Sequence, residues 1–123
     1  MSTDRLAQFS GKYINLETYR KSGQAVATPV WFVTEGGQII VVTKSETGKV
    51  KRLRNNDKVR VVPSGVRGEP QGEWVEGKAR FLDKGELERV LKARSKKYGF
   101  QAKLAGFVSR TKGELVGISI ALD

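Results

Sequence analysis

The segment from Thr43 to Arg54 contains the residues best placed to bind a charged ligand. It reads TKSETGKVKRLR, with an apolar strand predicted to end at Thr43 and a short helix predicted to begin near Thr47. The first N–H groups of a helix have no partner within the helix and lie at the positive end of its dipole. The junction between this strand and this helix is therefore a candidate site for a phosphate group.

Two basic side chains and a glycine strengthen this prediction. Lys49 and Arg52 are three residues apart, so they are neighbours on one side of the helix. Gly48 has no side chain and allows the backbone to approach a ligand closely. A phosphate could then contact the Thr43 hydroxyl, the free backbone amides, Lys49 and Arg52. An amphipathic helix with a solvated basic face explains the same residues, and the G-x-x-x-x-G-K pattern of a P-loop is absent.

A second candidate is the apolar strand ATPVWF over residues 27–32. Pro29 cannot donate to a strand ladder, so it indicates a sheet edge, a bulge, or backbone groups turned toward a ligand. Trp31 and Phe32 point to opposite faces of a strand, so at least one of them is expected in the core. An ordinary core strand accounts for this pattern equally well.

Composition restricts the chemistry further. The 123 residues contain neither Cys nor His, which excludes thiol nucleophiles, Ser-His-Asp triads and His-ligated metals within this sequence. An enzyme built from this chain would therefore rely on a cofactor for the difficult step. The formal net charge of +10 favours an anionic partner, or else a solvated basic surface. No apolar run is long enough to cross a bilayer and no signal-peptide core is visible, so a cytoplasmic location is expected.

Hydrophobic patterning predicts a mainly β protein that forms one domain over residues 1–123. Gly77 indicates a bulge or a close approach of another backbone, Pro63 is expected to end a strand, and Asp83 with Glu86 forms a capping box. Strands are predicted over residues 12–20, 25–34, 39–43, 58–62, 73–82 and 114–122. Helices are predicted over residues 3–9, 47–56, 83–98 and 101–109. Six strands with few helices favour an antiparallel barrel with one or two covering helices.

The order of these blocks resembles the split barrels of the pyridoxamine 5′-phosphate oxidase-like family. The matching stretches read ATPVWF, VVTKSETGKVKRLRNN, GVRGEP and VEGKAR, followed by a helix that ends RSKKYG. Within the family, the chain is most similar to the branch of F420-dependent oxidoreductases. The resemblance implies a six-stranded antiparallel split barrel of Greek-key type. It also implies a homodimer that holds a flavin or deazaflavin in a cleft between the subunits.

The resemblance further implies which residues of this chain would bind the cofactor. Residues next to the ring would come from the second strand and from the start of the fifth: Ala27, Thr28, Pro29, Val30, Gln71 and Trp74. Residues next to the ribityl chain and phosphate would come from the basic segment: Val42, Thr43, Lys44, Thr47, Gly48, Lys49, Lys51 and Arg52. Gly48 stands where the FMN-binding oxidases of the family carry an arginine, and Lys51 and Arg52 could supply that charge. No catalytic side chain and no metal ligand is expected.

These implications lead to a functional hypothesis. The chain is expected to transfer a hydride between coenzyme F420, with FMN as the alternative, and an organic substrate that the sequence does not identify. The elements that read pyridoxine phosphate in true oxidases have no counterpart here, so a role in vitamin B6 synthesis is not expected. One alternative is a carrier that holds the cofactor without turnover, and another is a basic β-barrel that binds single-stranded nucleic acid. We expect no nucleic-acid partner, because the charge is concentrated on helices and not interleaved with aromatic residues on a sheet. We expect no membrane partner either.

Overall fold

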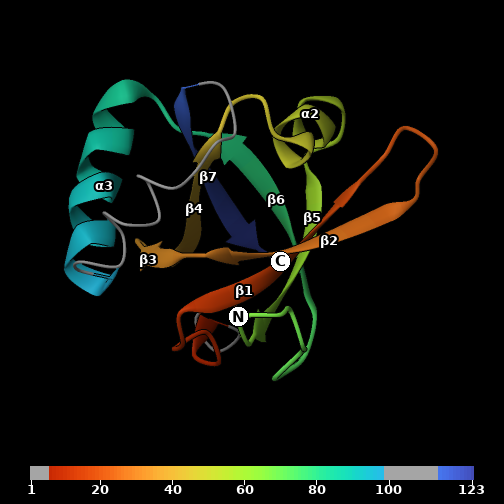
Figure 1. Cartoon of the computed structure of the whole chain (residues 1–123), viewed down its shortest axis with the longest axis horizontal. Helices are drawn as coiled ribbons and strands as arrows, with labels where there is room; N and C mark the ends of the chain where they lie inside the picture. Colours follow the sequence, from red (N-terminus) through yellow and green to blue (C-terminus); the bar gives the residue numbers. More distant parts are fainter. Residues whose placement is uncertain (1–5, 99–113) are drawn as a thin grey trace.

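The computed structural model describes residues 6–98 and 114–123, which form an antiparallel barrel flanked by helices (Figure 1). Helix α2 spans Gly48–Asn55 and helix α3 spans Lys84–Tyr98. The strands are β1 Tyr13–Tyr19, β2 Ala25–Trp31, β3 Val33–Glu35, β4 Gln38–Lys44, β5 Lys58–Ser64, β6 Val75–Phe81 and β7 Leu115–Leu122. The predicted helical segment 101–109 and the first residues of segment 3–9 lie outside the described residues. Within the described parts, no helix is both long and apolar enough to cross a membrane.

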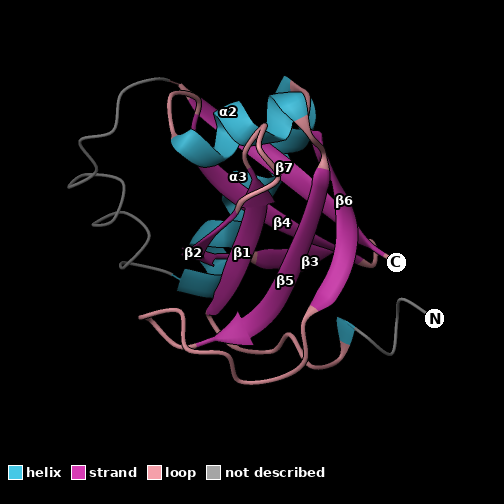
Figure 2. Cartoon of the chain, turned by 90° about the vertical axis from the view of Figure 1, so that its right-hand side faces the viewer, coloured by secondary structure: helices cyan, strands magenta, loops and turns pink. Residues whose placement is uncertain are grey.

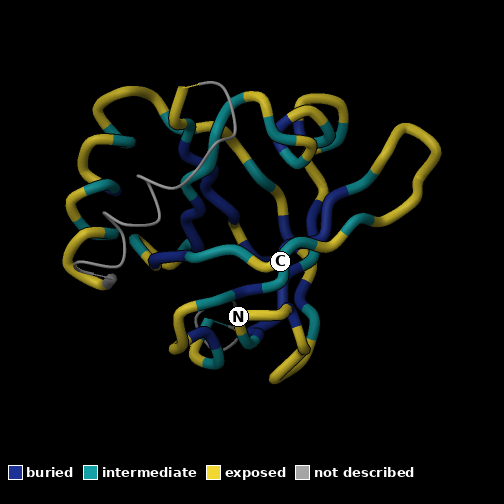
Figure 3. The backbone as a smooth tube through the Cα atoms, viewed as in Figure 1, coloured by how far each residue is buried: buried dark blue, intermediate teal, exposed yellow. Residues whose placement is uncertain are grey.

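The two edge strands of the curled sheet are consecutive in the chain. The strand order is β2-β1-β5-β6-β7-β4-β3, and each neighbouring pair is antiparallel. β2 pairs with β1 at one edge, β3 pairs with β4 at the other, and only Phe32 separates β2 from β3. Two views at right angles show the strands wrapping around a common interior (Figures 1 and 2). The buried parts of the backbone follow these strands, and the turn between β1 and β2 is exposed (Figure 3). The predicted fold class, a mainly β split barrel, is confirmed.

The structure has seven strands instead of the predicted six, because the segment 25–34 divides at Phe32. The Phe32 side chain is only 2% exposed and packs edge-on against Phe9, with 6.3 Å between the ring centroids. The Phe32 carbonyl accepts a hydrogen bond from Lys97 Nζ at 2.9 Å. A carbonyl that bonds to a helix side chain leaves the strand ladder, so the chain bends here and changes neighbours. The other predicted strands agree with the observed ones to within two residues at each end.

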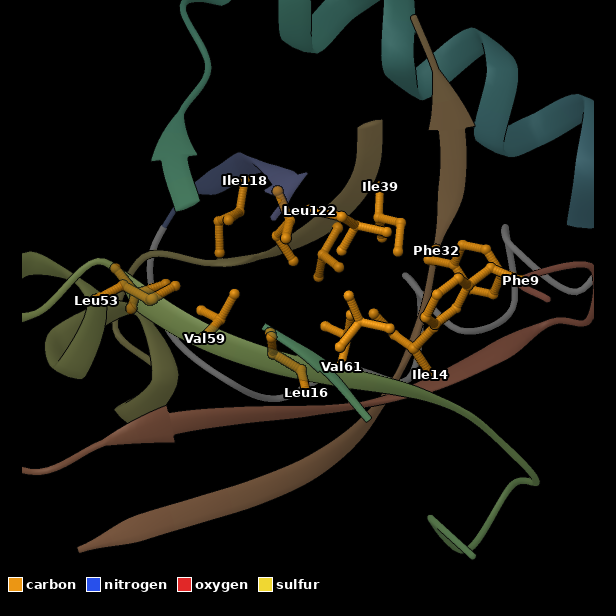
Figure 4. Close-up of a cluster of buried hydrophobic side chains, with 14 residues drawn as sticks. Phe9, Ile14, Leu16, Phe32, Ile39, Leu53, Val59, Val61, Ile118 and Leu122 are labelled. Atoms are coloured by element: carbon orange, nitrogen blue, oxygen red, sulfur yellow. The ribbon is translucent and has the colours of Figure 1, made fainter. Parts of the chain in front are cut away.

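Alternation along the strands builds the barrel core (Figure 4). Every second side chain of β1, β5 and β7 points inward and is almost fully buried: Ile14, Leu16, Val59, Val61, Ile118 and Ile120. Helix α2 closes one end of the barrel with Val50 and Leu53, which are the two residues predicted for its apolar stripe. Burial of each such side chain contributes on the order of 1.5–3 kcal/mol. This packing fixes α2, and with it the basic segment, against β1.

Helix α3 begins with the predicted capping box. The Glu86 N–H donates to Asp83 Oδ1 at 2.8 Å, and the Asp83 N–H donates to Glu86 Oε1 at 3.1 Å. Arg80 on β6 forms an ion pair with Glu86 at 2.8 Å. Arg80 and, after it, the Asp83 N–H lower the pKa of Glu86 to about 2. The helix also buries Val90 against β3 and β4, so α3 covers the outer side of these two strands.

Proline and glycine account for two further details of the sheet. Pro63 lies inside β5, so the prediction that it ends this strand is wrong. β5 and β6 pair only as far as Val61 and Val75, and the missing N–H of Pro63 therefore costs no ladder bond on that side. Gly77 is a close approach, because a Cβ at this position would lie 2.6 Å from the Ala121 carbonyl oxygen.

Candidate functional site

The loop between β4 and α2 leaves the start of the helix open to a ligand. Thr47 is the N-cap residue, but its hydroxyl donates to the Lys44 carbonyl at 3.0 Å, and in the described structure it caps no helix N–H. The loop is held in place on its other side as well. The Ser45 N–H donates to the Glu114 carbonyl at 2.8 Å, and the Glu114 N–H donates to Ser45 Oγ at 3.1 Å. The first-turn N–H groups thus lack the cap oxygen that a Thr at this position usually provides, which suits an anion.

Lys49 and Arg52 lie next to this helix start without an acidic partner. Both are half-buried, and no carboxylate among residues 6–98 and 114–123 pairs with either. Burial lowers the pKa of Lys49, and the charge of Arg52 lowers it further. Burial also lowers the pKa of Arg52, and Arg20 at the tip of the β1–β2 hairpin adds to this effect. A bound phosphate would relieve the repulsion among these cations.

Arg52 is held by a residue that the sequence analysis missed. Its Nε–H donates to Thr18 Oγ1 at 2.6 Å, and Thr18 is fully buried on β1. The guanidinium reaches back to the first turn of the helix, where an added Cβ on Gly48 would lie 2.8 Å from Nη1. The available signal was the position of Thr18 on the same strand face as Ile14 and Leu16, where a polar residue interrupts an apolar pattern.

The predicted residues of β2 divide between two faces. Thr18 on β1 pairs with Val26 on β2, and Thr28 lies two residues further on the same face. The half-buried side chains of Thr28 and Val30 therefore face the interior that α2 closes. The two other predicted residues of this strand are exposed on its outer face: Ala27 and Pro29. β2 pairs only with β1 along this stretch, so of the three explanations offered for Pro29 the structure shows a sheet edge.

The predicted residues of the β4–α2 segment also separate. Val42 packs against the cluster under α3, whereas Thr43 lies on the inward face with Val41. Lys44 is half-buried, and its carbonyl is occupied by the Thr47 turn. Lys51 is exposed, on the side of the helix away from Arg52. The structure therefore gathers the first helical turn, Lys49 and Arg52, and places Thr43 on the inward face of the strand that precedes them.

Gln71 and Trp74 lie at the end of the barrel opposite α2, where β5 ends and β6 begins (Figures 1 and 2). Val75, next to Trp74, pairs with Val61, and the Gln71 N–H donates to the Pro63 carbonyl at 2.7 Å. Trp74 is half-buried under Arg60, whose guanidinium carbon lies 4.9 Å from the ring centroid. Trp74 also lines an open hollow of about 740 Å³. Gln71 and Trp74 are thus not among the residues at the start of α2.

The group at the start of α2 fits a phosphate-bearing cofactor. It combines an uncapped first turn, two cations without carboxylate partners in the described chain, and a glycine against which the Arg52 guanidinium packs. The described residues contain no group of three His, Cys, Asp or Glu side chains that could hold a metal ion. The arrangement can bind and orient an anion.

Comparison with known proteins identifies the fold and the family. A conserved hypothetical protein from Mycobacterium tuberculosis has 24% identity and a TM-score of 0.74, with 99% of this chain and 81% of that chain covered. A FAD-binding protein from Mesorhizobium loti has 16% identity and a TM-score of 0.67, with 100% of this chain and 88% of that chain covered. The heme storage protein from Vibrio cholerae has 14% identity and a TM-score of 0.72, with 98% of this chain and 89% of that chain covered. These likenesses show the fold, and no curated protein sequence matches. The sequence model described as pyridoxamine 5′-phosphate oxidase matches residues 3–123, and the chain therefore belongs to this family.

Proposed function

We propose that this chain binds the phosphate of a flavin or deazaflavin at the start of α2 and uses that cofactor in an oxidoreductase reaction. The pair Lys49 and Arg52 carries the proposal, because two neighbouring half-buried cations without a carboxylate partner in the described chain form a favourable site for an anion. Membership in the pyridoxamine 5′-phosphate oxidase family and a fold shared with a FAD-binding protein support a flavin as that anion's carrier.

The roles of the residues follow from their positions. When bound, the cofactor would supply the hydride-transfer chemistry. Arg52 would contact the phosphate through its two terminal nitrogens, Lys49 would add a point charge, and the first-turn amides would complete the cradle. Thr43 and Thr28, which face the interior from β4 and β2, would orient the remainder of the cofactor. The contribution of the protein is binding and orientation.

The identity of the cofactor is tested by spectroscopy and titration. Coenzyme F420 and FMN are the two cofactors that we propose, and the solved structures of the same fold favour a flavin in general. The purified protein should carry the visible absorption of a flavin or deazaflavin, or should bind one of FMN and F420 when titrated. A colourless protein that binds neither cofactor would contradict the proposal.

A carrier without turnover is the second candidate. It is favoured by the heme storage protein from Vibrio cholerae, which shares the fold at a TM-score of 0.72. The present chain has no His among its 123 residues, so it cannot provide a His-ligated haem site, and its cargo would be the flavin or deazaflavin itself. Oxidation of the reduced, bound cofactor by an added organic acceptor, measured against the free cofactor, separates the two functions. An enzyme accelerates this step, whereas a carrier does not.

A homodimer forms part of the proposal. Gln71 lies beside Pro63 and Trp74 lies next to the Val75–Val61 pair, away from the start of α2, and a partner subunit could bring such residues to the cofactor. Light scattering during size-exclusion chromatography should give twice the mass of the 13.6 kDa chain. A monomeric protein that still binds the cofactor would contradict a site that takes Gln71 and Trp74 from the partner subunit.

A further inference from the structure

A buried hydroxyl on β1 has no packing explanation. Thr18 is fully buried and lies at an inward position of β1, where the alternate residues Ile14 and Leu16 are apolar core residues. A hydroxyl in such a place costs free energy unless it is hydrogen-bonded. The Thr18 hydroxyl accepts a hydrogen bond from Arg52, 34 residues further along the chain, with 2.6 Å between Nε and Oγ1. The threonine therefore fixes the arginine that faces the candidate phosphate site.

The bond to Thr18 uses only one of the three guanidinium nitrogens. With Nε held, the terminal nitrogens Nη1 and Nη2 point toward the first turn of α2, since both lie near the place where a Cβ on Gly48 would be, at 2.8 and 3.6 Å. No carboxylate of the described chain occupies them. A planar fork with free N–H groups is the geometry that binds two oxygens of a phosphate. The fork thus lies beside the first turn of α2, whose amides carry no side-chain cap.

Gly48 provides the space that this arrangement needs. A Cβ at 2.8 Å from Nη1 is closer than van der Waals contact, so any side chain at position 48 would move the guanidinium. The backbone of Gly48 is helical and has no positive φ, so its conformation does not require glycine. The requirement for glycine at this position comes from Arg52.

We infer that Thr18 and Gly48 are positioning residues of the anion site, which hold the Arg52 fork over the first turn of α2 before a ligand arrives. The inference rests on the proposed function for the identity of the ligand, a phosphate-bearing flavin. Immobilising a long side chain in advance removes about 0.5–1.5 kcal/mol from the cost of binding, which corresponds to about a 2- to 12-fold gain in affinity. Neither residue needs to touch the cofactor ring.

Three variants separate this role from a structural one. Thr18→Val keeps the shape of the side chain and should weaken FMN binding about 2- to 12-fold, whereas Thr18→Ser keeps the hydroxyl and should restore most of the affinity. Gly48→Ala should weaken binding by at least as much. Its free energy of unfolding should stay unchanged, because the three nearest atoms belong to the flexible end of Arg52 and can move while Nε keeps its bond to Thr18. Lower affinity together with unchanged stability is the result that a purely structural role would not give.

The same titrations are carried out with riboflavin and in the Arg52→Ala background. Riboflavin lacks the phosphate, so the variants should bind it like the wild-type protein. Thr18→Val should cause no further loss of FMN affinity once Arg52 is absent. Suppose that the wild-type protein binds FMN, and that the three variants Thr18→Val, Thr18→Ser and Gly48→Ala bind FMN as tightly as the wild-type protein does. The inference is then wrong, while the proposed function stands.

A measurement without flavin tests the positioning role if the protein binds no flavin or deazaflavin. If the wild-type protein binds neither FMN nor F420, the proposed function fails, and inorganic phosphate then serves as the probe. Titration with phosphate should shift the NMR signal of the Arg52 Nε–H group in the wild-type protein and in Thr18→Ser. The shift should be smaller at the same phosphate concentration in Thr18→Val. No shift in the wild-type protein would overturn the positioning role as well.

Discussion

Replacing Arg52 by Ala should weaken FMN binding far more than replacing Arg54 by Ala on the same helix. Arg52 is half-buried, contacts Thr18 and has no carboxylate partner in the described chain. Arg54 is exposed and lies 5.9 Å over the ring of Phe81. One charge-assisted phosphate contact contributes about 1.5–3 kcal/mol, so the Kd of Arg52→Ala should rise roughly 10- to 150-fold. Arg54→Ala removes the same formal charge and measures the screened long-range attraction alone, which should change Kd by no more than a few-fold.

The assay is quenching of FMN fluorescence at fixed ionic strength, with denaturant unfolding of each variant alongside. Unfolding is needed because Arg52→Ala leaves the buried Thr18 hydroxyl without its arginine donor, which can lower the free energy of unfolding by about 1–3 kcal/mol. A folded Arg52→Ala protein that binds FMN as tightly as Arg54→Ala and the wild-type protein would refute the assignment of the phosphate site.

The pKa of Lys49 lies below its usual 10.5 in the free protein, so FMN affinity should fall as pH rises through this lowered value, and Lys49→Met should lose that alkaline dependence. Without FMN, the free energy of unfolding should rise with pH over the same range, whereas the FMN affinity falls. The reason is that Lys49 binds more protons in the unfolded protein than in the folded protein over this range. The Arg60 bond and, more weakly, the Tyr19 bond lower the pKa of Glu17 below 4.5. The stability from this ion pair should therefore be complete above pH 4.5 and be lost as pH falls through the lowered pKa, and Glu17→Gln should flatten the profile measured by denaturant unfolding. Gly77→Ala should lower the free energy of unfolding by about 1–3 kcal/mol, because its Cβ would meet the Ala121 carbonyl at 2.6 Å. Gly85→Ala in α3 is the matched control and should be neutral or stabilising, since the nearest atom is Asp83 Oδ1 at 3.6 Å.

Features of the sequence with a local physical cause were predictable. Gly36 and Gly37 both adopt positive φ, at 58° and 79°, in the predicted turn between two strands. The capping box of Asp83 and Glu86 satisfies helix N–H groups within four residues of chain, so its pattern alone identifies the start of α3. The amphipathic helix in the basic segment was likewise predictable from the period of its apolar residues.

Features that depend on distant parts of the chain were not predictable in this way. The strand 25–34 divides at Phe32 because Lys97, 65 positions away, takes the Phe32 carbonyl. Pro63 stays inside β5 because β6 has already stopped pairing at that point. The contact of Thr18 with Arg52 spans 34 positions, and only the register of the barrel brings them together. The predicted ring contacts Gln71 and Trp74 show the same limit, since one chain places them at the far end of the barrel from α2.

The most direct test of the phosphate site is a crystal structure of the protein grown with FMN. The FMN phosphate is predicted within hydrogen-bond distance of the Arg52 terminal nitrogens and of the first-turn amides of α2, with Lys49 beside it and the Arg52–Thr18 bond unchanged. Bound FMN whose phosphate lies elsewhere, for example in the hollow beside Trp74, would contradict the central claim.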